Sequence, residues 1–327
     1  MTDRTPLEEQ RATVNGRPAG TTEWRGSITE RGTTMDSYYG RGIVKEPVWK
    51  PEIPLYLFTG GMAGSLSVLH GLARLSGNHT LGRRALYLGA VADLASPALL
   101  VSDLGRPERF VNMFRVFKVT SPMSVGSWIL MVSGATSTTA ALLTLVDSLR
   151  PVRWAAEVVS FASGPPLATY TGALLANTAI PVWHDARRLL PWLFGASAAA
   201  SGGAAAMLVT PPACAGPARR AAIAGVAVEL GLSVAMERRL GLVGEVYRHG
   251  EAGRFATVAK ACAGVGAGLV AWKGRRSRAV AVSGAALVLA GELALRWSVF
   301  KAGFQSARDP RYTVLPQKER VARRKAA

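Results

Sequence analysis

The stretch SVGSWILMVSGATSTTAALLTLVDSL, residues 124–149, decides the fold class of this chain. It carries no charged residue before Asp147, and it is long enough for a helix to cross a bilayer, which takes roughly 20 apolar residues. Similar stretches lie on both sides of it: Pro54–Leu75, Ala85–Leu104, Trp154–Ile180, Leu189–Val209, Ala221–Met236, Phe255–Trp272 and Ala279–Phe300. The sequence therefore predicts an all-α integral membrane protein with eight transmembrane helices.

Helices are predicted because a chain in lipid must satisfy its own backbone hydrogen bonds, and the period-two alternation of a β-barrel is absent. A hydrophobic fraction of 49% is possible for a soluble protein, but its arrangement in blocks between arginine-rich breaks excludes that class. The 35 glycines agree, since small residues let membrane helices approach closely.

The net charge of +18 lies in loops and tails, where it orients membrane proteins and meets anionic lipid, so no nucleic-acid partner is expected. Residues 1–52 form a polar basic tail that has the composition of a disordered chain over its first thirty residues. Asp36–Lys50 carries enough apolar side chains to pack against the membrane face or a partner. Residues 303–327 form a second basic tail. An excess of Lys and Arg on the side of both tails predicts cytoplasmic termini.

The sequence gives little sign of a cofactor of its own. Of four histidines only His70 lies well inside a span, so a haem held by two histidines is not expected. Cys214 and Cys262 are solitary, which argues against an iron–sulfur cluster in this chain, and no other metal site is predicted. No nucleotide-binding glycine motif occurs between a strand and a helix. If the protein takes part in redox chemistry, its metal centres must belong to another subunit.

Several ionisable residues fall inside the predicted spans, at a cost of about 2.5–3.5 kcal/mol each on insertion scales. They are Asp93, Glu157, Glu229, Lys260, Glu292 and Arg296. Structural explanations remain open for most of them: Glu292 and Arg296 are spaced to pair on one helix, and Glu157 and Lys260 can lie at interfacial depth. Asp93 has no partner nearby in the sequence and is the stronger functional candidate.

The loop after the second span, Ser102–Phe110, combines helix-ending residues with a high density of charge. Gly105 suits the position that follows a helix, and Pro107 blocks its continuation. The aromatic and methionine side chains that follow, Phe110, Met113, Phe114 and Phe117, have helical spacing. They predict a surface helix on the membrane face or under a partner.

Four segments in chain order carry a resemblance to a known family: PEIPLYLFTGG (51–61), SDLGRPERF (102–110), TSPMSVGSW (120–128) and PLATYTG (166–172). Together they resemble the NrfD/PsrC family of polysulfide reductase membrane subunits, over residues 36–300 and most specifically in the first four spans. The resemblance implies two four-helix bundles, residues 53–180 and 181–302. It also implies an iron–sulfur ferredoxin-like partner, a molybdopterin oxidoreductase catalytic subunit, and a quinone held without haem.

The family's quinone lies near the membrane face between the first and fourth spans. By motif, its span-four tyrosine is Tyr170, and a span-one position that is histidine in some members is Tyr56. An asparagine one turn earlier in such members is Ile53 here, so the binding mode differs in detail. Asp93 matches an acidic position in span two. The partner-facing loop corresponds to Asp103 with Arg106, and the neighbouring Arg109 is included in the predicted docking surface.

Quinone reduction consumes two electrons and two protons, so a site needs donors at the carbonyls and a proton route. The hypothesis is that Tyr56 and Tyr170 position the head group while Asp93 and Asp103 carry protons. Taken without the resemblance, Tyr170 also fits an interfacial packing tyrosine. Abundant arginine, alanine and glycine are typical of a GC-rich bacterial genome, which favours a bacterial inner membrane and menaquinone.

Two other functional classes stay open. The chain could be a membrane anchor for a catalytic pair, without quinone chemistry of its own. It could instead translocate protons, in which case Glu157, Glu229, Lys260, Glu292 and Arg296 would form a polar chain through the second bundle. The sequence does not reveal the partner's substrate or the direction of electron flow.

Overall fold

The computed structural model describes residues 13–14, 17–18, 43–104 and 106–326. The chain divides into two units, Met1–Ile43 and Val44–Ala327. In the first unit, strand β1 (Thr13–Val14) pairs antiparallel with β2 (Arg17–Pro18). The predicted disorder of the first thirty residues falls largely outside the described residues, as does Gly105.

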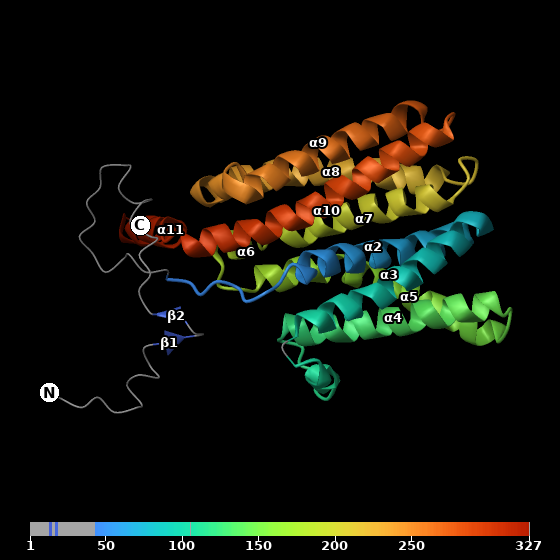
Figure 1. Ribbon diagram of the computed structural model, residues 1–327, viewed down its shortest axis with the longest axis horizontal. Helices are drawn as coiled ribbons and strands as arrows, with labels where there is room; N and C mark the ends of the chain where they lie inside the picture. Colours follow the sequence, from blue (N-terminus) through green and yellow to red (C-terminus); the bar gives the residue numbers. More distant parts are fainter. Residues whose placement is uncertain (1–12, 15–16, 19–42, 105, 327) are drawn as a thin grey trace. The chain divides into compact units, whose positions relative to one another are not determined.

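The second unit contains all helices of the described chain, and each of the eight predicted stretches falls on one long helix (Figure 1). These helices are α2 (Glu52–Leu75), α3 (His79–Asp103), α4 (Pro122–Leu145), α5 (Arg150–Ala176), α7 (Leu190–Val209), α8 (Gly216–Leu240), α9 (Gly250–Lys273) and α10 (Arg278–Arg308). Shorter helices connect or follow them: η3 (Pro107–Phe114), α6 (Pro181–Asp185), η4 (Gly241–Tyr247) and α11 (Arg311–Ala326). The predicted basic tail after residue 302 is thus helical over most of its length.

Five of the long helices in the described part of the chain, α3, α4, α7, α9 and α10, are long and apolar enough to cross a membrane. The spans predicted on α2, α5 and α8 do not meet this test and stay predictions. For α8 the reason is its composition: Arg219 and Arg220 lie near its start, and Arg238 and Arg239 form its last turn.

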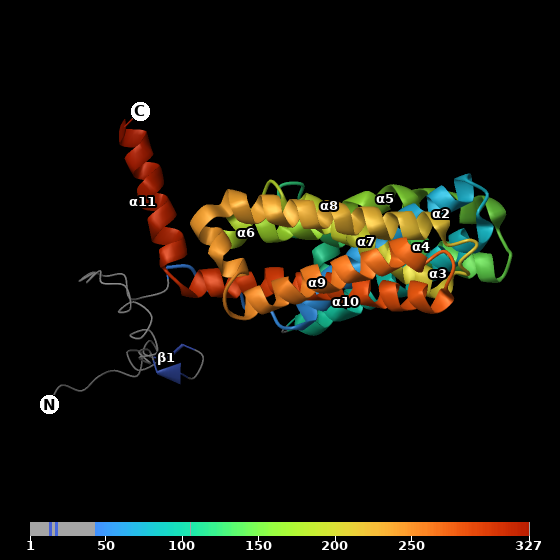
Figure 2. The same cartoon turned by 90° about the horizontal axis from the view of Figure 1, so that it is seen from above.

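The long helices run side by side in both views (Figures 1 and 2). α2 contacts α3 and α5, and α4 contacts α3 and α5; likewise α7 contacts α8 and α10, and α9 contacts α8 and α10. α7 and α10 also contact α2, and α7 contacts α5. Successive helices alternate in direction. We call the end of α2–α5 that holds Glu52, Asp103 and Pro122 the Tyr56 end, and the end that holds Leu75 and Arg150 the Arg74 end.

Glycines set the closest approaches between these helices, as the glycine content predicted. A Cβ added at Gly64 of α2 would lie 2.5 Å from the Gly164 carbonyl oxygen of α5. A Cβ at Gly203 of α7 would lie 2.6 Å from the Ala218 carbonyl oxygen of α8. Since real Cβ contacts are never this short, larger residues would push these helix pairs apart.

The distribution of side chains suits a lipid surrounding. Large apolar side chains on the long helices point outward, among them Val91, Leu94, Leu142, Val228 and Val265, each more than half exposed. Serines lie inside, and one pair joins α5 to α2: Ser160 Oγ donates to Ser67 Oγ at 3.0 Å. This arrangement, polar within and apolar without, is expected where lipid replaces water.

The segment before α2 packs on the chain's own helices. Trp49 stacks on Trp183 of α6 with ring centroids 5.4 Å apart, and Val44 packs on the same apolar core. Glu46 pairs with Arg308 at 3.1 Å. Val44 and Trp49 therefore pack within the chain and not on the membrane face or a partner, whereas Val48 is 81% exposed and leaves that prediction open at its position.

Candidate functional site

Tyr170 of α5 lies at the Tyr56 end in a seat made by a glycine. A Cβ at Gly126 of α4 would lie 2.1 Å from Tyr170 Cε2, so only glycine leaves room for the ring. The Tyr170 hydroxyl is buried and has no hydrogen-bond partner among the described residues. Tyr56 lies in the apolar core of the same end, with 3% of its surface exposed. Tyr170 therefore offers an unused donor.

Other buried polar atoms at this end also have no partner in the described chain. They are Glu52 Oε2 at the start of α2, Trp128 Nε1 in α4 and Thr171 Oγ1 in α5. Sequence reasoning did not single out these three residues, although each lies within or next to a quoted motif. Unpaired buried polar groups are costly in a folded protein, so each of these atoms is a candidate for contact with a polar ligand.

The loop residues lie at the same end. Asp103 ends α3, and its Oδ1 accepts a hydrogen bond of 2.9 Å from the backbone N–H of Lys50. Arg106 and Arg109 are exposed, and η3 buries none of its residues. The predicted surface helix is thus present as a 3-10 helix, with Phe114 packed edge-on against Trp128 at 6.0 Å.

Asp93 is buried between α3 and α4, about 15 Å along α3 from Asp103 at 1.5 Å per residue. Its Oδ2 accepts hydrogen bonds from Ser133 at 3.1 Å and Ser137 at 2.6 Å, while Oδ1 has no partner within the described residues. The sequence showed no partner near Asp93, and its partners indeed lie 40 and 44 residues away, where two serines of the next span hold one oxygen. Pro97 has no N–H to bond the Asp93 carbonyl one turn earlier.

Three of the candidate proton-path residues come together at mid-length of α7, α8 and α10. The carboxyl groups of Glu229 and Glu292 lie close to each other, and Glu229 Oε2 and Glu292 Oε1 are buried without a hydrogen-bond partner among the described residues. Ser197 Oγ donates to Glu292 Oε2 at 2.5 Å. The guanidinium of Arg296 lies 3.8 Å from the Phe194 ring centre, and its Nη2 donates to the Phe194 carbonyl. The sequence left open that Glu292 and Arg296 form an ion pair on their helix, but no such pair is found among the described residues.

The other two residues of that predicted path lie elsewhere. Lys260 Nζ pairs with Glu237 Oε1 at 2.5 Å, between α9 and the last turns of α8. Glu157 is on α5 at the Arg74 end, where its Oε1 lies 3.3 Å from Arg74 Nη1. The five residues therefore form three separate groups.

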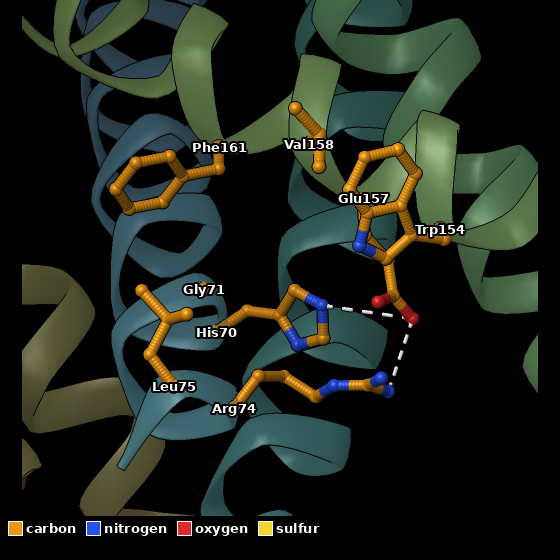
Figure 3. Close-up of a pocket in the computed structure, with 8 residues that line it drawn as sticks. All are labelled: His70, Gly71, Arg74, Leu75, Trp154, Glu157, Val158 and Phe161. Atoms are coloured by element: carbon orange, nitrogen blue, oxygen red, sulfur yellow. Dashed lines mark hydrogen bonds and ion pairs between the residues drawn. The ribbon is translucent and has the colours of Figure 1, made fainter.

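Glu157 also lines a cavity of about 250 Å³ between α2 and α5 (Figure 3). His70 and Arg74 extend from α2 toward the Glu157 carboxylate, and Phe161 and Trp154 of α5 complete the lining with Gly71, Leu75 and Val158. Sequence reasoning noted His70 only as a poor haem ligand. The sequence did offer a signal: His70 is the one histidine well inside a predicted span, and Glu157 is an ionisable residue inside another.

The family described as Polysulphide reductase, NrfD matches residues 44–243, which is more than half of the chain. The chain belongs to the NrfD family. The match runs from the segment before α2 to η4 and includes all four motifs that carried the resemblance. No curated protein matches the chain significantly. As an NrfD protein it is a multi-pass membrane subunit of a multi-subunit reductase complex.

Proposed function

We propose that this NrfD chain exchanges electrons and protons between an iron–sulfur partner and menaquinone at the Tyr56 end. The observation that carries the proposal is the buried, unpartnered hydroxyl of Tyr170, in a seat that only Gly126 permits. A quinone carbonyl is an acceptor without a donor of its own, so it complements this hydroxyl. When bound, quinone would supply the quinone/quinol redox couple, whose interconversion transfers two electrons and two protons.

Each of the proposed site residues has a role that follows from its position. Tyr170 donates to a carbonyl and fixes the orientation of the head group, while the core position of Tyr56 shapes the neighbouring wall. Asp103 lies at the membrane face, where protons enter from water, and its contact with Lys50 ties the α2 entry to α3. Asp93 holds a proton deeper in the protein, because one of its oxygens is anchored by two serines and the other is free to accept.

The exposed Arg106 and Arg109 on the loop and η3 provide the docking surface for the iron–sulfur subunit, which connects to a molybdopterin catalytic subunit. The helices α2–α5 and α7–α10 act as two four-helix bundles in a bacterial inner membrane, with both termini cytoplasmic. The charge of the loops and tails supports this orientation.

The test uses the complex purified from native membrane with its partners. Bound quinone, iron and molybdenum are quantified, and quinone-linked turnover is compared for Tyr170→Phe, Asp93→Asn and wild type. We expect quinone in the preparation and slower turnover in both variants. A partner complex without quinone, even after addition of menaquinone, would support an anchor role instead.

Proton translocation is the second candidate, and the buried group of Glu229, Glu292 and Arg296 favours it. Two neighbouring buried carboxyl groups beside a guanidinium form an arrangement that can bind and release a proton within the membrane. Glu292→Gln is expected to abolish proton movement per turnover, measured with a pH-sensitive dye in proteoliposomes, while quinone binding persists. Unchanged proton stoichiometry in Glu229→Gln and Glu292→Gln would assign the group a structural role.

A further inference from the structure

A second cavity, of about 370 Å³, adjoins the cavity in Figure 3. His70, Arg74 and Glu157 line both. The smaller cavity is otherwise apolar and aromatic, whereas the larger is otherwise mostly polar, lined by His79, Arg83, Leu86, Thr144, Asp147 and Arg153. These three residues therefore form a polar wall between an apolar space and a polar one.

His70 leaves one nitrogen without a partner in this wall. Its side chain is 2% exposed, and Nδ1 lies 2.8 Å from the Gly82 carbonyl oxygen. Because a carbonyl only accepts, Nδ1 carries the proton, and in the neutral ring Nε2 is an acceptor. Nε2 is buried without a hydrogen-bond partner among the described residues and lies 4.0 Å from Glu157 Oε1. Nε2 and Glu157 Oε1 thus face each other as two acceptors, with no donor between them.

Arg74 adds a donor to the same wall. Its Nη1 reaches Glu157 Oε1 at 3.3 Å, and its side chain is 40% exposed, so the guanidinium has further N–H groups to offer. A ligand that fits must therefore donate a hydrogen bond to His70 Nε2 or Glu157 and accept a hydrogen bond from Arg74. A hydroxyl group does both.

The remaining side chains that line the smaller cavity suit a flat, apolar ligand. Phe161 forms one wall, and it lies so close to α2 that a Cβ at Gly71 would be 2.3 Å from its Cδ2. Trp154 is 64% exposed at the mouth. The volume equals the space of about eight water molecules at roughly 30 Å³ each, which suits a small ring system.

We propose that this cavity binds a neutral hydroxylated aromatic ring of the quinol class, as a second site at the Arg74 end. It lies about 21 Å from Tyr56 along α2, at 1.5 Å per residue. A phosphodiester group fits less well, since it has no hydrogen to donate to His70 Nε2. The hydroxyaromatic chemistry rests on the cavity alone, whereas its identification as quinol rests on the proposed function.

The larger cavity gives the ring's hydroxyl group a contact with water through Glu157. Its lining includes Asp147, whose side chain is 71% exposed and pairs with Arg153 at 3.1 Å. Arg153 Nε in turn lies 4.0 Å from Glu157 Oε1. The ligand's proton can therefore be exchanged on the polar side while its ring stays on the apolar side.

The experiment titrates the protein, in phosphatidylcholine nanodiscs under anaerobic conditions, with menadiol, a two-ring quinol. Binding is read from quenching of Trp154 fluorescence, obtained as the difference between wild type and Trp154→Phe. We expect Gly71→Ala, which drives Phe161 into the cavity, to weaken the affinity for menadiol, measured from this signal, at least 10-fold. His70→Phe, which keeps an aromatic ring but removes Nε2 together with the Nδ1–Gly82 hydrogen bond, is expected to weaken it about 3- to 10-fold, as for one lost hydrogen bond to the ligand.

Matched controls separate the two sites. Gly268→Ala places the same methyl group in open space and should bind as wild type. Tyr170→Phe should leave the Trp154 signal unchanged, so a failure at the Tyr56 end does not count against this cavity. Menadione, which has no hydroxyl proton to donate, should bind the Trp154 site more weakly than menadiol.

Equal quenching in wild type, Gly71→Ala and His70→Phe would overturn the proposal. So would loss of the menadiol signal when phosphatidylglycerol replaces phosphatidylcholine, because an anionic lipid would then be the occupant. If Gly71→Ala does not assemble into nanodiscs, His70→Phe and the comparison of menadiol with menadione decide the question.

Discussion

Replacing Gly126 with alanine is expected to displace the ring of Tyr170 while the protein still folds. The added Cβ would lie 2.1 Å from Cε2 and 2.6 Å from Cδ2 of Tyr170, whereas carbon atoms in contact are about 3.5 Å apart or more. The ring must therefore withdraw by roughly 1.4 Å. Overpacking of this kind lowers the free energy of unfolding by about 1–3 kcal/mol. The better helix propensity of alanine offsets up to about 1 kcal/mol of this loss.

A displacement above 1 Å at a positioning group is expected to lower the rate of quinone-linked turnover on the order of 100-fold. The assay is turnover and menadione binding by the complex purified with its partners. Gly134→Ala is the control, because it makes the same change in the same helix and meets only the Asp93 carbonyl oxygen at 3.8 Å, an ordinary contact. Wild-type turnover and affinity in Gly126→Ala would refute the placement of the head group at Tyr170.

Three further predictions concern stability in nanodiscs. Ser137→Ala removes a donor from buried Asp93 and should lower the free energy of unfolding by about 1–3 kcal/mol, measured by thermal unfolding, with Ser163→Ala as the control that affects only a bond within its own helix. Arg278 donates to the Met207, Leu208 and Thr210 carbonyls at the end of α7, so Arg278→Ala should lower stability by about 1–2 kcal/mol, more than Arg276→Ala does. Tyr247 lies on η4 outside the spans, and burial raises the pKa of its phenol. The free energy of unfolding should therefore fall as pH rises above about 10, because the phenol then ionises in the unfolded state but not in the folded state. Tyr247→Phe should therefore reduce the loss of stability in alkaline titration, and an unchanged alkaline midpoint would count against this reading.

Sequence reasoning located the long helices well because each one depends on local composition. The stretch at 124–149 corresponds to α4, and the predicted segment at 154–180 corresponds to most of α5. It was less successful at the helix ends, where α10 continues past Phe300 to Arg308, since charged side chains extend a helix beyond the apolar stretch. The aromatic content of residues 44–50 was noticed, but its packing partner, Trp183, lies far away in the sequence.

The candidate sites show the same division. Asp93, Glu157, Glu229 and Glu292 stand out in the sequence because charge in an apolar stretch is costly. Their partners do not stand out: Ser137 is 44 positions from Asp93, and Arg74 is 83 positions from Glu157. Serines and glycines are common in this chain, so composition gives no reason to select Ser133, Ser137 or Gly126 as the ones that face a functional group.

The sequence by itself determined that the chain is helical, that it belongs in a membrane and that it has family motifs at the Tyr56 end, because apolar length and motif order are properties of neighbouring residues. Only the tertiary structure decided which buried groups meet. The rotation of each helix and its closest approach, set by pairs such as Gly64 with Gly164, place Glu229 beside Glu292 and turn His70 toward Glu157. These contacts join helices across long intervals of chain, and no local pattern encodes them.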